Sequence, residues 1–260
     1  MTAETFLKYL AVLLAGSLAA ESAVLSGMLP LPVAAYHGLH LALMAALLTI
    51  TLALYRSRRR EGADDKAVVL LFAAGLAFTL VGDYVNSQLS DVNPVTLKLT
   101  WALLFFGLGY SCYIAGLWKG LALLPARPRL LIAIPVIAAI NVIGWFTSVA
   151  SRVAGDPALT YGSFAFNATL YVLLPWLAIR HLVARRFSLD AVVVVIGAVL
   201  LPYSDLVLFT TWLDQPPGAP ISTTLYVSNW IVYFSGQCLI NVFTASAVLA
   251  SRQRAGLASD

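Results

Sequence analysis

Three acidic side chains lie inside long apolar stretches of this sequence: Glu21, Asp83 and Asp205. A carboxylate at the centre of a lipid bilayer costs at least about 2.5–3.5 kcal/mol, so such a group usually faces the interior of a helix bundle and has a function there. Carboxyl groups donate and accept protons, and two of them in different protonation states can divide acid and base catalysis between them. The positions of these three residues depend on the helices that carry them, so those helices must be located first.

The apolar stretches themselves indicate a protein that spans a membrane many times. Of 260 residues, 60% are hydrophobic and 11% are charged, whereas a soluble domain carries roughly 25% charged residues. A spanning helix takes about 20 residues, so 260 residues hold roughly eight spans with their connections. No room is left for a soluble second domain. We predict an all-α polytopic membrane protein, with a single integral membrane domain over residues 1–260 and both termini in the cytoplasm. Its eight predicted transmembrane helices cover residues 6–28, 33–55, 67–88, 97–118, 129–149, 160–182, 190–213 and 223–249. The breaks between them are short, so sequential helices are expected to be antiparallel neighbours.

The basic residues favour this topology. With the N-terminus inside, 14 of the 16 Lys and Arg residues fall on the cytoplasmic side, and only Lys98 and Arg152 fall outside, as the positive-inside rule requires. This topology accounts for the net charge of +4, and no nucleic-acid partner is expected. The first stretch continues to Met28, so we expect a helix there rather than a cleaved signal peptide. Cys112 and Cys238 lie in apolar stretches and are expected to pack there, without a disulfide or a metal site.

Polar residues from six predicted helices are expected at one depth. With a rise of about 1.5 Å per residue, Glu21, Asp83 and Asp205 should lie roughly 22–24 Å from the cytoplasmic surface, in the outer half of a hydrocarbon core about 30 Å thick. Counting inward from the other surface places four more polar residues roughly 6–10 Å deep. These four are His37, His40, Asn167 and Asn229. The sequence therefore predicts a polar cavity in the outer half of the bundle.

Helical periodicity indicates which polar residues share a face. The last helix carries a stripe spaced by three or four residues, which is predicted to face inward; its members are Tyr226, Asn229, Tyr233, Gln237 and Asn241. Asn86 shares a face with Asp83, and Pro202 lies one turn before Asp205, where it favours a bend. An alternative is that these polar groups only hydrogen-bond helices together. His37 and His40 are expected to form hydrogen bonds at the interface rather than to bind a metal.

Three stretches resemble the TMEM86/YhhN family of multispanning membrane proteins. They are Gly75 to Asp83 (GLAFTLVGD), Gly197 to Asp205 (GAVLLPYSD) and Tyr233 to Ile240 (YFSGQCLI). With the helix number, the resemblance covers most of the chain from the second helix to the last. The chain departs from the family in two places. Members usually carry Lys-Pro in the second helix, where this chain reads YHGLH, and many carry a His three residues before a Tyr in the fourth, where this chain has Tyr110 before Tyr113.

The resemblance implies a hydrolase, because the characterised members are lysoplasmalogenases, which cleave the vinyl ether of a lysoplasmalogen to a fatty aldehyde and a glycerophospho-base. One neutral carboxyl would protonate the enol-ether carbon, and one carboxylate would stabilise the oxocarbenium ion and activate water, as in glycosidases. We expect Asp83 and Asp205 to be this catalytic pair, without metal or cofactor. The expected supporting residues are Glu21, His37, His40, Asn86, Tyr110, Tyr113, Asn167, Ser204, Asn229, Tyr233 and Gln237.

The expected partners are membrane lipids and a lysophospholipid substrate, lysoplasmenyl-ethanolamine or lysoplasmenyl-choline. The expected location is a bacterial plasma membrane, or the endoplasmic reticulum in a eukaryote. Three alternatives remain. A metal-dependent hydrolase would use His37, His40, Glu21 and one aspartate, although no His-Glu-x-x-His signature is present. A small transporter or proton relay would use the carboxylates as an ion pathway, with polar residues continuing to both surfaces. A lipid-binding protein would not turn substrate over.

Overall fold

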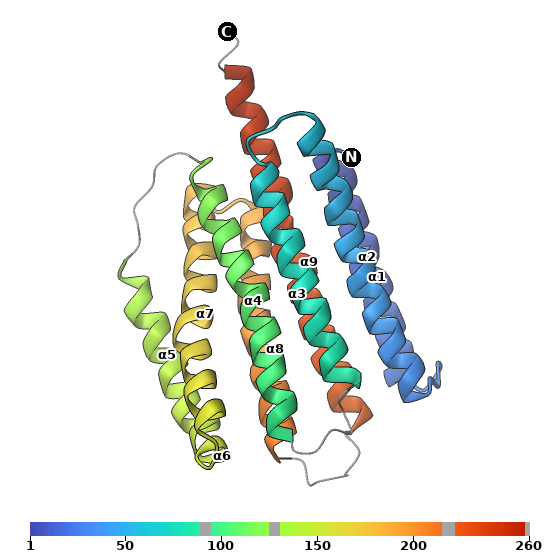
Figure 1. The fold of residues 1–260 in the computed structure, drawn as a ribbon. Coiled ribbons are helices and arrows are strands. Elements are labelled where there is room, and N and C mark those ends of the chain that lie inside the picture. Colours follow the sequence, from blue (N-terminus) through green and yellow to red (C-terminus); the bar gives the residue numbers. More distant parts are fainter. Residues whose placement is uncertain (89–94, 125–130, 215–221, 258–260) are drawn as a thin grey trace.

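The computed structural model describes residues 1–88, 95–124, 131–214 and 222–257, and these form a bundle of long helices (Figure 1). The elements are α1 (Ala3–Leu25), α2 (Val33–Arg60), α3 (Lys66–Gln88), α4 (Val95–Leu121), α5 (Ala133–Ser148), α6 (Ala150–Val153), α7 (Pro157–Ala184), α8 (Leu189–Asp214) and α9 (Thr223–Leu257). Within these ranges every element is a helix, as predicted. Each of the eight apolar stretches corresponds to one long helix, and α6 is an additional single turn.

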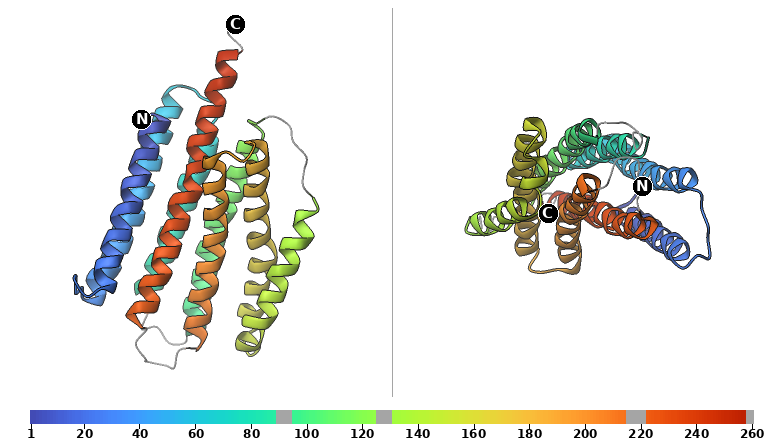
Figure 2. Two further views of the ribbon diagram at one scale, coloured as in Figure 1. Left: turned by 180° about the vertical axis from the view of Figure 1, so that it is seen from behind. Right: turned by 90° about the horizontal axis from the view of Figure 1, so that it is seen from below.

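Seven of the helices pack around a closed ring. Each of α1, α2, α3, α4, α7, α8 and α9 packs on the next in that order, and α9 returns to α1. Figure 2, seen from below, shows the ring flattened into two rows, with α2, α3 and α4 opposite α1, α9 and α8. Helix α7 closes one end of the two rows. The ring therefore encloses inner faces that come from distant parts of the sequence.

The prediction of eight spanning helices is confirmed for seven. Among the described residues, α1 to α4 and α7 to α9 are long and apolar enough to cross a membrane. The predicted span 129–149 is instead the 16-residue α5, which is about 24 Å long and short of a hydrocarbon core about 30 Å thick. Residues 129 and 130 lie outside the described ranges. The chain is thus an integral membrane protein with seven candidate spans.

Sequential helices are not all neighbours, contrary to the expectation from the short connections. Helix α4 packs on α7, and α5 packs on the outer side of α7 (Figure 2). The reason lies in the side chains: α7 buries Ser163, Asn167 and Tyr171, whereas α5 leaves large apolar side chains such as Ile140 and Phe146 exposed. A helix with polar residues on its inner face belongs in the ring, and an apolar helix can face lipid.

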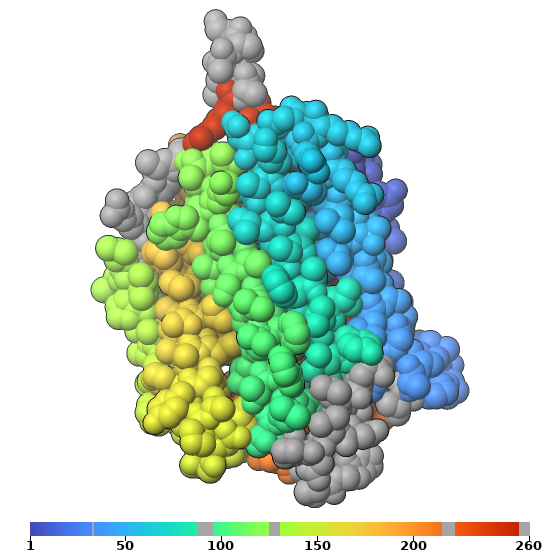
Figure 3. Space-filling model, in the orientation of Figure 1, coloured from blue at the N-terminus to red at the C-terminus, as the bar shows by residue number. Residues whose placement is uncertain are grey.

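Both the start of α1 and the end of α9 lie at one end of the bundle, which we call the terminal end (Figure 1). This agrees with an even number of passes along the bundle, while its orientation in a membrane stays a prediction. Around the ring, apolar side chains such as Leu97, Trp101, Leu104 and Val81 are exposed. Figure 3 shows the face on which α2, α3 and α4 lie side by side.

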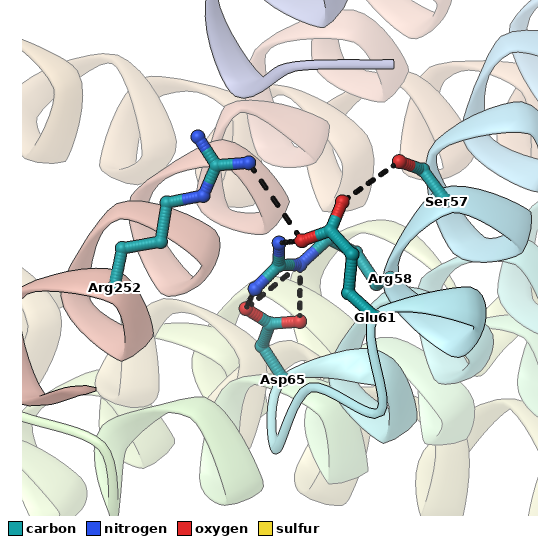
Figure 4. Close-up of polar contacts among 5 residues, drawn as sticks. All are labelled: Ser57, Arg58, Glu61, Asp65 and Arg252. Carbon is teal, nitrogen blue, oxygen red and sulfur yellow. Dashed lines mark hydrogen bonds and ion pairs between the residues drawn. The ribbon is translucent and has the colours of Figure 1, made fainter.

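Charged residues tie helices together at the terminal end. Arg58 at the end of α2 donates from Nε to Asp65 Oδ1 at 2.9 Å and from Nη2 to Asp65 Oδ2 at 2.8 Å. It also contacts Glu61, which pairs with Arg252 of α9 at 3.8 Å (Figure 4). Asp65 is fully buried and Arg58 nearly so, so this cluster fixes the turn between α2 and α3.

Candidate active site

The two aspartates lie on helices in opposite rows of the ring and line one cavity. Asp83 of α3 and Asp205 of α8 both border a cavity of about 470 Å³. Asp83 is buried and Asp205 is partly exposed to the cavity. The ring therefore brings together the two carboxyl groups that sequence patterning had placed at a common depth.

Tyrosine hydroxyl groups hold both carboxyl groups in place. Tyr233 of α9 donates to Asp83 Oδ2 at 3.0 Å. Tyr110 of α4 donates to Asp205 Oδ2 at 2.6 Å, and Tyr171 of α7 donates to the same oxygen at 3.1 Å. Each hydrogen bond crosses between helices, so ring packing sets the orientation of the carboxyl groups. Among the described residues, both hydrogen bonds to the Asp205 side chain reach Oδ2.

A second, mostly apolar chamber adjoins the first cavity. Its empty space, including the part open to the surroundings, is about 580 Å³. It is bordered by aromatic and aliphatic side chains of α4, α5, α7 and α8, among them Leu103, Phe166, Phe209 and Trp212. Four residues border both spaces: Asn86, Phe106, Asp205 and Leu208. Asp205 thus stands where a polar space meets an apolar one. An amphiphilic molecule has a polar part that suits the first space and an apolar part that suits the second.

The predicted supporting residues divide into those at the cavities and those behind them. The 470 Å³ cavity is bordered by His37, His40, Asn86, Ser204, Asn229 and Tyr233, and the apolar chamber by Asn86 and Asn167. Asn229 Oδ1 is buried and has no hydrogen-bond partner in the described part of the chain, so it can accept a hydrogen bond from a ligand. Asn167 already donates to the Asn141 carbonyl at 2.6 Å, which links α7 to α5.

Tyr113, Gln237 and Glu21 border neither cavity. The Tyr113 hydroxyl donates to Gln237 Oε1 at 2.6 Å, so this pair joins α4 to α9 behind the site. Glu21 of α1 is fully buried and contacts Tyr36 and His40 of α2. Tyr110 reaches the site only through its bond to Asp205. These four residues can influence the site only through another side chain.

The predicted set did not include Tyr171, Tyr226 or Lys98. Tyr171 shares a helical face with Asn167, and Tyr226 lies one turn before Asn229, so periodicity placed both on inner faces without showing that they meet the site. Tyr226 borders the cavity and stacks near His40, with ring centroids 5.6 Å apart. Lys98 Nζ lies 2.9 Å from the centroid of the Trp212 ring at the end of the apolar chamber. Its place at the start of the predicted helix 97–118 had indicated only topology for this lysine.

The stripe on α9 continues past the cavity toward the terminal end. Gln237, Asn241 and Thr244 are fully buried there, and Asn241 donates to the Gln237 carbonyl at 2.8 Å. His181 of α7 is also buried in this half, and neither ring nitrogen has a hydrogen-bond partner in the ranges described. Buried polar residues therefore continue along the bundle beyond the two cavities, which lie in the other half.

The metal site considered as an alternative is not assembled in the described ranges. Among these residues no group of three His, Cys, Asp or Glu side chains could hold a metal ion. Cys238 is buried and unpaired, and Cys112 is partly buried and unpaired. The small residues Gly116 and Gly120 permit close helix packing, since a Cβ atom at Gly116 would lie 2.8 Å from Phe72 and one at Gly120 would overlap the Phe243 ring.

The fold and this cavity define a helical integral membrane protein with two buried aspartates beside a chamber of lipid-like polarity. Residues 37–244 match the YhhN family, and the chain belongs to that family. The matched range includes α3, α8 and the cavity-facing part of α9. No curated protein matches the chain, and neither does a solved structure.

Proposed function

We propose that this protein is a membrane-embedded hydrolase that cleaves the vinyl ether bond of lysoplasmalogens to a fatty aldehyde and a glycerophospho-base. The observation that carries the proposal is the position of Asp205, which borders both the polar cavity with Asp83 and the apolar chamber. A lysophospholipid with its tail in the apolar chamber would have its first tail atoms, where the vinyl ether lies, beside the two carboxyl groups.

The chemistry suits two carboxyl groups in different states. A neutral carboxylic acid donates its proton to the enol-ether carbon that is not bonded to oxygen, and the cation that forms is an oxocarbenium ion. The second carboxyl group, ionised, stabilises this cation, and water attacks the carbon next to oxygen. Collapse of the resulting hemiacetal releases the aldehyde and the glycerol oxygen. Tyr110 and Tyr171 hold the carboxyl group of Asp205 for this reaction.

Lys98 supports a phosphate-containing substrate. Its side chain is 1% exposed and its ammonium group lies against Trp212, which borders the apolar chamber. We expect its charge to reach His37, which borders the polar cavity. A fixed positive charge near both spaces would attract the anionic head group of lysoplasmenyl-ethanolamine or lysoplasmenyl-choline. The host membrane would be a bacterial plasma membrane, or the endoplasmic reticulum in a eukaryote.

Aldehyde release from a vinyl-ether lysophospholipid by purified protein in detergent tests the proposal. Wild type is expected to release aldehyde in the presence of a chelator, and Asp83→Asn and Asp205→Asn are each expected to lose at least 100-fold in rate. Asp64→Asn is a matched control, because this aspartate is exposed in the turn between α2 and α3. The saturated alkyl analogue should give no aldehyde. Tight binding of vinyl-ether lipid without release from wild type would instead establish a lipid-binding protein.

A proton relay is a second candidate, favoured by the buried polar residues that continue along α9. Gln237, Asn241 and Thr244 lead from the aspartate cavity toward the terminal end. Proton uptake by liposomes containing the protein, driven by a potential, measures this activity. Flux that is lost in Asp83→Asn, together with no aldehyde release from wild type, would favour the relay over the hydrolase.

A further inference from the structure

A buried carboxylate and an imidazole form a pair beside the aspartate cavity. Glu21 of α1 is fully buried, and its Oε1 lies 3.0 Å from Nε2 of His40 on α2. Its other oxygen accepts a hydrogen bond from the Tyr36 hydroxyl. A carboxylate can only accept hydrogen bonds, so His40 Nε2 carries the hydrogen in this pair.

The other ring nitrogen of His40, Nδ1, can accept a proton. His40 borders the cavity that holds Asp83 and Asp205, and its Nδ1 is buried without a hydrogen-bond partner in the part of the chain described. With Nε2–H directed to Glu21, Nδ1 has a lone pair and no proton. A buried acceptor of this kind costs about 1–3 kcal/mol when it stays unpaired, so a hydrogen-bond donor placed beside Nδ1 would be favoured.

Packing fixes the orientation of this ring. His40 stacks on Trp230 of α9, with centroids 3.6 Å apart and planes 5° apart. The Tyr36 ring meets it edge-on at 4.1 Å. Contacts on both sides, together with the bond to Glu21, prevent the ring from turning, so the two nitrogens have different and constant surroundings. A carboxylate that orients an imidazole in this way is a recurrent arrangement for proton transfer.

We propose that His40 is the proton acceptor of this cavity and that Glu21 is the residue that positions it. The inference rests on the proposed function and assigns a step of it. His40 Nδ1 takes the proton of the water that adds to the oxocarbenium ion, which gives the hemiacetal and a protonated imidazole. In the next step this proton passes to the glycerol oxygen as its bond to carbon breaks, while the carboxylate formed in the first step takes the hemiacetal hydroxyl proton. Both groups then return to their starting states.

The two aspartates have separate tasks in this scheme. One donates the first proton, and the other stays ionised beside the cation. The titratable groups that face His40 are Glu21, Tyr36 and His37 from α1 and α2, and Tyr226 from α9. Asp83 and Asp205 complete the set from across the cavity.

Nitrogen-15 NMR of histidine-labelled protein tests the resting state without relying on activity. The chain has three histidines, so His37→Gln and His181→Gln assign the signals. We expect a neutral His40 ring with its proton on Nε2, and in Glu21→Gln we expect the other tautomer to become populated. A proton on Nδ1 in the wild type would overturn the assignment.

Turnover tests the step itself. His40→Phe keeps a ring for stacking on Trp230 but removes both nitrogens, and its kcat should fall about 100-fold or more with little change in the affinity for the saturated alkyl lysophospholipid. Added imidazole should restore part of the rate in His40→Ala. Tyr36→Phe removes the other donor to Glu21 while leaving the imidazole, so its loss should be much smaller.

These outcomes separate the two proposals. An active wild type together with an active His40→Phe would overturn the role of His40 and leave the proposed hydrolase intact. An inactive wild type would overturn both.

Discussion

The hydroxyl of Tyr110 on α4 lies 2.6 Å from Oδ2 of Asp205 on α8, and this contact joins two helices whose positions in the sequence are 95 residues apart. Tyr110 is fully buried. Its hydroxyl therefore holds one carboxyl oxygen, while Tyr171 donates to the same oxygen from α7 at 3.1 Å. The carboxyl group is set by three helices at once.

Removing the Tyr110 hydroxyl is expected to impair turnover. A hydrogen bond to a charged group contributes about 1.5–3 kcal/mol, so Tyr110→Phe should lower kcat roughly 10- to 100-fold. Tyr171→Phe should have a smaller effect because its bond is longer. Tyr113→Phe is the comparison, since its hydroxyl donates to Gln237 and to neither aspartate. Aldehyde release in detergent measures all three, and an equal loss in Tyr113→Phe would show that only packing matters.

Filling the apolar chamber should change the preferred chain length. Ala102 on α4 borders this chamber and is 8% exposed. Ala102→Leu adds three carbons to the space proposed for the tail, so long-chain substrates should lose more activity than short-chain ones. The comparison is kcat/KM over a series of alkenyl chain lengths. A uniform loss over the series would place the tail elsewhere.

Lys98 should matter for the charge of the head group. Lys98→Met keeps an unbranched side chain beside Trp212 and removes the positive charge. KM for a vinyl-ether lysophospholipid should rise several-fold, with a smaller change for an uncharged alkenyl glycerol. Aldehyde release from the two substrates measures the difference. Identical changes in KM would show that Lys98 does not act on the phosphate group.

Gly197 is expected to be required for the contact between α8 and α9. A Cβ atom there would lie 2.5 Å from the backbone nitrogen of Ile240 and 3.0 Å from the carbonyl oxygen of Gly236. Backbone atoms cannot move aside as a flexible side chain can, so Gly197→Ala should destabilise the bundle by about 1–3 kcal/mol. Gly144→Ala is the control, because nothing lies within 4 Å of its Cβ position. Thermal unfolding in detergent should show a lower Tm only for Gly197→Ala.

The buried ion pair at the terminal end should contribute to stability. Asp65→Asn leaves Arg58 buried without its charged partner, which typically costs about 3–5 kcal/mol. Glu61→Gln is a weaker change on the same arginine, since the Glu61 side chain is 44% exposed and exposed pairs contribute about 0–1 kcal/mol. Thermal unfolding of both variants checks this order. An equal Tm for both would mean that the pair is not buried in the membrane-bound protein.

The ends of the helices could be read from the sequence with differing success. Seven spans were recovered because about 20 consecutive apolar residues have few alternatives to a membrane helix. The predicted span 129–149 was longer than α5 (Ala133–Ser148), since an apolar stretch does not show whether its whole length is helical. Packing partners were less predictable: α4 was expected beside α5 but lies on α7, because loop length limits neighbours without selecting one.

The sequence by itself determined that this is a helical membrane protein and that Asp83 and Asp205 lie at a similar depth, because hydropathy and the rise per residue are local properties. Only the tertiary structure decided which groups meet. The bonds from Tyr110 and Tyr171 to Asp205, from Tyr233 to Asp83 and between Glu21 and His40 all join different helices. Such contacts depend on how each helix is rotated and on its neighbours in the ring. That choice comes from packing and polar pairing over the whole bundle, so no single stretch of sequence contains it.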